Sequence, residues 1–233
     1  MFGSYGEKYD LKTSEYNVGT ECISITMVSD TNRLLDELAI EDHMLGSNFP
    51  FWAELWPSAL ALARYIWNNV DFKGEQVLEL GCGLGLVGIL ARRKQAKVLM
   101  TDYNDDALMF AKHNAIKNRC GDIQFRSMDW QHPNLDNQKF KYILASDVIY
   151  EEQNWLPIVN IFNSHLDEHG EVMLSEPNRP NAHGFFEILR RQGFGFIQTP
   201  NTVSLNGRVS HVSIYRIRCK FCIEKSQKGG MAR

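Results

Sequence analysis

The chain has 233 residues, of which 44% are hydrophobic and 23% charged, and its formal net charge is −3. The composition predicts a packed core rather than a disordered chain, and the length fits one α/β domain with a short extension. A charge this close to neutral gives no reason to expect a nucleic-acid partner, because neutralising phosphates needs a basic face.

Membrane insertion and secretion are not expected either. The longest apolar stretches are interrupted by polar residues before a membrane span is reached. The first eight residues lack the basic start and apolar core of a signal peptide. The five cysteines form an odd, scattered set, which suggests a reducing environment. We therefore expect a cytoplasmic protein without a membrane partner.

Residues 1–50 are predicted to form an N-terminal extension with a short strand and a short helix. The first 20 residues are polar and rich in glycine and tyrosine, which predicts partial order at best. Residues 22–28 alternate between apolar and polar, as is typical of a strand, and a helical patch follows around Leu34 to Leu38. Residues 58–67 fit a helix with Pro57 in its first turn.

Beyond residue 75, short apolar runs alternate with helical stretches. Strands are predicted at residues 76–80, 97–101, 123–127, 142–146, 171–175, 195–198 and 210–217. Helices are predicted at residues 86–94, 105–118, 155–167 and 182–192. Such alternation indicates parallel strands joined by right-handed crossovers. Only a polar loop containing Asn206-Gly207 separates the last two strands, which predicts an antiparallel hairpin.

The predicted fold class is therefore α/β, with a Rossmann-like, mainly parallel seven-stranded sheet, helices on both faces and a C-terminal antiparallel hairpin. The main domain is expected to span residues 51–218. Residues 219–233 are expected to form a basic, disordered C-terminal tail.

A glycine-rich turn, Gly81-Cys82-Gly83-Leu84-Gly85, directly follows the first strand of the domain. Glycines let the backbone turn sharply and let a ligand approach the main chain. The next strand ends in Asp102, where a carboxylate can accept hydrogen bonds from both hydroxyls of a ribose. Glu79 precedes the turn and would repel a pyrophosphate, but it suits the cationic amino acid end of S-adenosylmethionine. A purely structural turn is the alternative interpretation.

The chain resembles the seven-β-strand S-adenosylmethionine-dependent methyltransferases, and among them the family 16 protein-lysine N-methyltransferases. Residues 51–59 (FWAELWPSA) and 77–88 (VLELGCGLGLVG) carry the resemblance, together with Asp129-Trp130 after the third strand. The fourth feature is Asp147-Val148-Ile149-Tyr150, an Asp-x-x-Tyr motif after the fourth strand. Residues 176–180 also resemble the segment after the fifth strand of the electron-transfer-flavoprotein lysine methyltransferases.

The predicted cofactor-binding residues are Trp56, Glu79, Gly81, Cys82, Gly83, Asp102, Asp129, Trp130 and Ser146. The resemblance implies that Trp56 and the glycine turn border the methionine part of the cofactor and that Asp102 binds its ribose. By the same resemblance, Asp129 and Trp130 take the adenine and Ser146 lies beside the sulfonium.

Asp147 and Tyr150 are implied to face the substrate and are the predicted catalytic residues. Trp56, Trp130 and Tyr150 could instead serve packing alone, and Asp147 could merely cap the following helix. Arg179 could either contact substrate or form an ion pair within its loop. No metal is expected, because neither Cys219 with Cys222 nor the two histidines at 165 and 169 complete a site.

Together these features predict an S-adenosylmethionine-dependent N-methyltransferase that acts on lysine side chains of a protein and works as a monomer. Amino-directed nucleic-acid methyltransferases carry an Asn/Asp-Pro-Pro-aromatic motif after the fourth strand, which this chain lacks. Two alternatives stay open, a methyltransferase for small-molecule amines and a catalytically silent module that only binds the cofactor.

Overall fold

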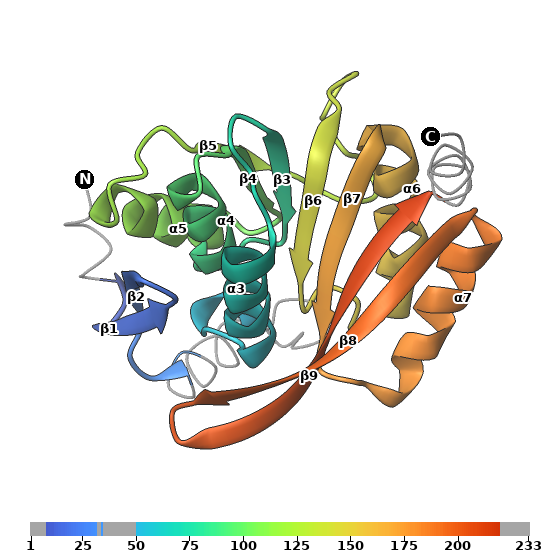
Figure 1. Cartoon of the computed structure of the whole chain (residues 1–233). Helices are drawn as coiled ribbons and strands as arrows, with labels where there is room; N and C mark the ends of the chain where they lie inside the picture. The colour runs from blue at the N-terminus through green and yellow to red at the C-terminus, as the bar shows by residue number, and fades with distance from the viewer. Residues whose placement is uncertain (1–7, 32–33, 35–49, 220–233) are drawn as a thin grey trace.

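The computed structural model describes residues 8–31, 34 and 50–219, and within them seven strands form one sheet in the order β5-β4-β3-β6-β7-β9-β8 (Figure 1). The strands of this sheet are β3 (Gln76–Leu80), β4 (Lys97–Asp102), β5 (Gln124–Ser127), β6 (Phe140–Ser146), β7 (Leu166–Glu176), β8 (Phe194–Leu205) and β9 (Arg208–Cys219). A separate two-stranded sheet contains β1 (Leu11–Val18) and β2 (Glu21–Val28).

Helices connect the parallel strands as predicted. They are α3 (Pro57–Asn69), α4 (Leu86–Arg93), α5 (Asp105–Lys117), α6 (Trp155–His165) and α7 (His183–Arg191), with short 3-10 helices η1 (Phe51–Ala53), η2 (Glu152–Asn154) and η3 (Pro180–Ala182). The pairs β3–β4, β4–β5, β3–β6 and β6–β7 are parallel, whereas β9 runs antiparallel to both β7 and β8. The predicted fold class is confirmed.

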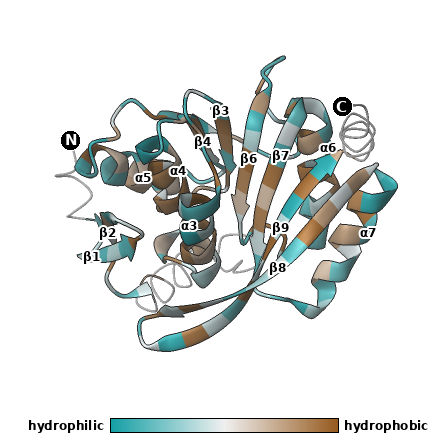
Figure 2. Cartoon of the chain, viewed as in Figure 1, coloured by the Kyte–Doolittle hydropathy of each residue, from teal (hydrophilic) through white to brown (hydrophobic). Residues whose placement is uncertain are grey.

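Helices cover both faces of the central sheet, so both faces are buried. Successive side chains of a strand point to opposite faces and therefore enter different cores. Val77 belongs to the core that also contains side chains of α3, α4 and α5, whereas its neighbour Leu78 belongs to the core of α6 and α7. The central strands are accordingly apolar along most of their length, while β8 and β9 alternate (Figure 2). This double burial explains why short apolar runs located the central strands correctly.

Of the two strands of the N-terminal hairpin, only the second was predicted. The expected strand at 22–28 corresponds to β2, but the expectation of partial order for the first 20 residues is wrong for β1, which pairs with β2 along its full length. Most side chains of β1 are exposed or half-exposed, so its sequence carries little apolar periodicity. The predicted helix around residues 34–38 lies almost entirely outside the described residues.

Asn114 of α5 and Asn118, which directly follows this helix, attach this hairpin to the main domain. The amide of Asn114 accepts from Thr26 N at 2.8 Å and donates to the Thr26 carbonyl and to the carbonyl of Leu84 in the glycine turn. The amide of Asn118 binds both main-chain groups of Ser24 in the same way. The edge of β2 that faces away from β1 is thus hydrogen-bonded by side chains.

The C-terminal hairpin is longer than predicted. Residues expected to form a polar loop extend β8 to Leu205, and the two strands are joined at Asn206-Gly207. Both turn residues have positive φ, 50° and 77°, as a two-residue turn that matches the strand twist requires. Val203 is buried against the core that contains α3, which gives the polar stretch an apolar anchor. Helix α6 ends two residues earlier than predicted, because Leu166 already pairs with Phe140 of β6.

Among the described helices, none combines the length and the apolar character that a membrane crossing needs.

Candidate active site

The carboxyl ends of the parallel strands surround a cavity of about 990 Å³. The chain passes from β3 outward to β4 and β5 and then returns to β6 on the other side of β3, so the cavity lies where the strand order reverses. Open α/β sheets bind ligands at this position. The cavity is lined by all eleven predicted site residues, namely Trp56, Glu79, Gly81, Cys82, Gly83, Asp102, Asp129, Trp130, Ser146, Asp147 and Tyr150. Their individual roles stay predictions.

The glycine turn has a backbone that other residues rarely adopt. Gly81, Gly83 and Gly85 have φ values of 61°, 50° and 84°. A Cβ on Gly81 would lie 3.3 Å from the ring of Trp130, and a Cβ on Gly85 would lie 3.2 Å from the main chain of Ala111. Conformation therefore favours glycine at all three positions, and close packing requires it at Gly81 and Gly85 as well.

Glu79 lies beneath the turn and is almost completely buried. Its Oε2 accepts a hydrogen bond of 3.0 Å from Gly88 N in the first turn of α4. Burial is the main cause that raises the pKa of Glu79 to about 8. The Gly88 N–H opposes this change, and the nearby charge of Asp102 contributes to it. A cationic ligand group in the cavity would favour the ionised carboxylate.

Asp102 at the end of β4 holds the turn from the other side. Its Oδ2 accepts from Gly83 N at 2.9 Å and its Oδ1 accepts from Asn104 N at 3.0 Å. Desolvation raises the pKa of Asp102, while these main-chain N–H groups lower it. Asp102 lines the cavity, and a carboxylate oxygen that accepts one hydrogen bond can accept a second, so this side chain suits ribose hydroxyls.

Asp129 and Trp130 follow β5 at the far end of the cavity. Asp129 Oδ1 accepts a hydrogen bond of 2.9 Å from Gln131 N, which lowers the pKa of this half-exposed carboxyl. The indole N–H of Trp130 is buried and has no acceptor among the described residues. Because buried donors are nearly always satisfied, this group fits a polar atom of a bound ligand.

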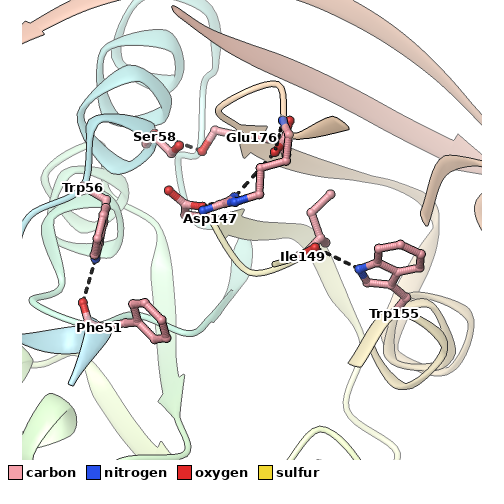
Figure 3. Close-up of polar contacts among 9 residues, drawn as sticks. Phe51, Trp56, Ser58, Asp147, Ile149, Trp155 and Glu176 are labelled. Carbon is pink, nitrogen blue, oxygen red and sulfur yellow. Dashed lines mark hydrogen bonds and ion pairs between the residues drawn. The ribbon is translucent and has the colours of Figure 1, made fainter. Parts of the chain in front are cut away.

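Three aromatic residues line another part of the cavity. The indole of Trp56 donates to the carbonyl of Phe51 at 2.7 Å (Figure 3). The Phe51 ring lies 5.0 Å from that of Tyr150. Burial raises the pKa of Tyr150 to about 12, so its hydroxyl stays protonated at neutral pH. Phe51 begins one of the segments that carry the resemblance, but no sequence pattern assigns it a role of its own.

Asp147 follows β6 and has a left-handed backbone, with φ 60°. Asp147 N donates to Ser175 O of β7 at 2.9 Å, which fixes the main chain of the motif. Its Oδ1 lies 2.5 Å from Nη1 of Arg179. Of the two alternatives for Arg179, the structure contains the ion pair, although Arg179 also lines the cavity. A positive φ in a non-glycine residue of a cavity wall is typical of a functional site.

The cavity carries an excess of acidic side chains. Among the described lining residues, seven are Asp or Glu and two are Lys or Arg. Such a lining favours a ligand with positive charge and opposes a pyrophosphate. No cluster of three or more His, Cys, Asp or Glu side chains suited to a metal ion occurs in the described part of the chain.

Two N-terminal residues were missed by sequence reasoning. Lys8 and Tyr9 line the cavity, and the Tyr9 hydroxyl donates to Asp106 Oδ2 at 2.6 Å. The Tyr9 ring also packs edge-on against Trp52 with centroids 5.7 Å apart. No local pattern marks these residues, because their contacts are with segments far along the chain.

Comparisons with known proteins agree with this geometry. A model of the family described as lysine methyltransferase matches residues 36–192. The chain is 31% identical over 190 residues to EEF1A lysine methyltransferase 3 of Mus musculus, covering 78% of each. It is 29% identical over 152 residues to a histidine protein methyltransferase 1 homolog of Dictyostelium discoideum, covering 63% of this chain and 48% of that protein. The chain thus spans about half the length of this second relative.

Among solved structures, the ribosomal protein L11 methylase of Lactobacillus delbrueckii subsp. bulgaricus superposes with a TM-score of 0.54 and 25% identity, covering 67% of this chain and 77% of that one.

Proposed function

The chain belongs to the family of S-adenosylmethionine-dependent lysine methyltransferases, and we propose that it transfers a methyl group to a lysine side chain of a protein. The observation that carries this proposal is the position of the Asp-x-x-Tyr motif. Asp147 and Tyr150 line the same cavity as Glu79, Asp102 and the glycine turn. An acceptor group and a cofactor can therefore meet within one enclosed space.

The residues present fit S-adenosylmethionine. The acidic lining suits its net positive charge, the glycine turn permits close approach, and the unpartnered indole N–H of Trp130 suits its adenine. Asp102 would hold the ribose and Glu79 the amino group. The cofactor supplies a methyl group on a sulfonium, and the C–S electron pair stays on sulfur as the new N–C bond forms.

The protein's task is then to present a neutral amine. At pH 7, removing the proton from a lysine of ordinary pKa costs about 4–5 kcal/mol. Asp147 would accept an N–H bond from the amine and so direct its lone pair. The rings of Phe51, Trp56 and Tyr150 would exclude water and stabilise the cationic product. Bulk water would take the proton.

Histidine is the second candidate acceptor, since one relative is named for histidine methylation. The excess of carboxylates in the cavity wall favours the entry of the more basic lysine, which arrives as a cation, over that of a histidine. We also propose that the protein is cytoplasmic and that it acts as a monomer. Light scattering after size exclusion would test the oligomeric state.

The direct test is transfer of a tritiated methyl group from S-adenosylmethionine into an undialysed cell lysate. Protein is then separated from small molecules, and the modified residue is located by mass spectrometry. Label on a lysine side chain is expected, and label on histidine would replace lysine as the acceptor. Label confined to small molecules, or no transfer by a protein that binds S-adenosylhomocysteine, would contradict the proposal. The matched control is Asp147→Ala.

A further inference from the structure

Arg179 bridges two carboxylates at the cavity wall. Its Nη1 lies 2.5 Å from Asp147 Oδ1 and 3.5 Å from Glu176 Oε1. Glu176 ends β7, its side chain is fully buried, and its Oε1 also accepts from Arg179 N at 2.9 Å. Glu176 does not line the cavity, whereas Arg179 and Asp147 do. The three residues therefore form a row from the core of the sheet to the cavity.

The loop that carries Arg179 is fixed to the C-terminal hairpin. Asn178 has a φ of 62°, its amide donates to the carbonyl of His211 at 3.1 Å, and it accepts from the Ser213 hydroxyl at 2.6 Å. Pro180 follows directly and restricts the backbone of Arg179. The guanidinium is thus held in place before any substrate arrives, so little conformational entropy is lost when it acts.

This arrangement addresses an electrostatic difficulty of the proposed reaction. A carboxylate beside an acceptor lysine stabilises the ammonium form and so raises the pKa of the amine. Methyl transfer needs the opposite, a neutral amine with a free lone pair. A cation on the far side of the same carboxylate reduces its negative field while leaving a lone pair free to accept an N–H bond. Arg179 can be this cation, because its Nη1 contacts one oxygen of the Asp147 carboxylate.

We propose that Arg179, held by Glu176, is a positioning residue that orients Asp147 and offsets its negative charge, so that the acceptor lysine reacts as a neutral amine. This inference rests on the proposed lysine methyltransferase function. It gives Asp147 the role of a hydrogen-bond acceptor and leaves water to take the proton. It also explains why the fold buries a glutamate at the end of β7 and pairs it with the loop arginine.

Other titratable groups lie near Asp147 and Arg179, and their charges also affect the pH profile. They are Tyr150 and Glu151 after β6, Asp102 of β4, Glu176 of β7 and Tyr215 of β9. Burial raises the pKa of Glu176, as does the Asp147 charge, whereas the N–H groups of Arg179 and Asn178 and the Arg179 charge lower it. Tyr150 stays protonated across the range of the assay.

The experiment measures tritiated methyl transfer into the most strongly labelled protein of a dialysed lysate between pH 6 and 10. The lysate concentration is raised until the rate no longer increases, which gives the maximal rate. The acid limb of the maximal rate reports the bound complex. Arg179→Met is expected to move this limb upward by about one pH unit, because one positive charge is lost. Arg179→Lys keeps the charge and should move it by less than half as much. Arg191→Met, an exposed arginine paired with Glu187, is the matched control and should leave the profile unchanged.

Glu176→Gln provides the opposite sign. It removes a negative charge behind Arg179, so the acid limb is expected to move to lower pH. A uniform rate loss in Arg179→Met without a shift, or an upward shift in Glu176→Gln, would overturn the inference. S-adenosylhomocysteine binding, measured by calorimetry, verifies folding. If Arg179→Met loses this binding, the pH profile of Glu176→Gln alone tests the inference. An acid limb of Glu176→Gln that does not move would then contradict it. Absence of lysine methylation by the wild-type protein would instead refute the proposed function.

Discussion

Glu79 makes the stability of the protein depend on pH in a direction opposite to that of most carboxylates. Burial raises its pKa to about 8 from an ordinary 4.5, so the folded protein binds a proton that the unfolded chain releases. The stabilisation is fully present below pH 4.5 and is lost as the pH rises toward 8. Glu79→Gln mimics the protonated form and can still accept from Gly88 N.

The magnitude follows from the two pKa values. Their difference corresponds to about 5 kcal/mol, or about 1.4 kcal/mol for each pH unit in between. Since domains are stable by about 5–15 kcal/mol, the effect is large enough to measure. Relative to the wild type, Glu79→Gln is therefore expected to gain stability steadily as the pH is raised from 5 to 8.

The assay is urea unfolding of the ligand-free protein at pH 5, 6, 7 and 8, followed by tryptophan fluorescence. The free energy of unfolding of each variant is plotted against pH, so that groups common to both cancel in the difference. Glu75→Gln, at an exposed position just before the same strand, is the matched control and should run parallel to the wild type. Parallel curves for Glu79→Gln and the wild type would refute the reasoning, because Glu79 would then be ionised in the folded protein.

Three further substitutions test the site. Asp102→Ala should weaken S-adenosylhomocysteine binding by about 100-fold, since two bonds to a charged acceptor are lost; unchanged affinity in calorimetry would remove its ribose role. Asp147→Ala should retain that affinity but lose methyl transfer, and equal loss of both would place Asp147 in the cofactor site or the fold. Gly85→Ala should lower the urea-unfolding free energy by at least about 1 kcal/mol more than Gly193→Ala. Both glycines have a φ of 84°, but only a Cβ at Gly85 would contact neighbouring atoms, so equal losses would exclude the packing argument.

The site was predictable because parallel strands place their carboxyl ends together. Glu79, Asp102 and Asp147 each stand at or beside the end of a buried apolar strand, so local sequence was enough to bring them to one edge of the sheet. The ion pair between Asp147 and Arg179 was not predictable in the same way. The two residues are separated by a helix and a strand, and charge alone does not choose one partner among many.

The N-terminal contribution to the cavity could not be predicted for a related reason. Strand β1 has a largely solvent-exposed pattern, and Tyr9 is held by contacts with distant residues such as Trp52, Asp106 and Phe110. Such contacts depend on how separate segments pack, which apolar periodicity does not encode. The length of β8 was underestimated because its outer half is polar and relies on pairing with β9.

The hydrogen bonds from Asn114 of α5 and from Asn118 after it affect the tendency of the protein to aggregate. An open strand edge offers unpaired N–H and C=O groups to any other extended chain and is a common starting point for aggregation. On β2 these groups are already bound by Asn114 and Asn118, at Thr26 and Ser24. A helix thereby closes the sheet without adding a strand. Replacing Asn114 by leucine would preserve bulk but leave buried main-chain groups of β2 without partners, so local opening of this edge, with self-association of the opened protein, would follow.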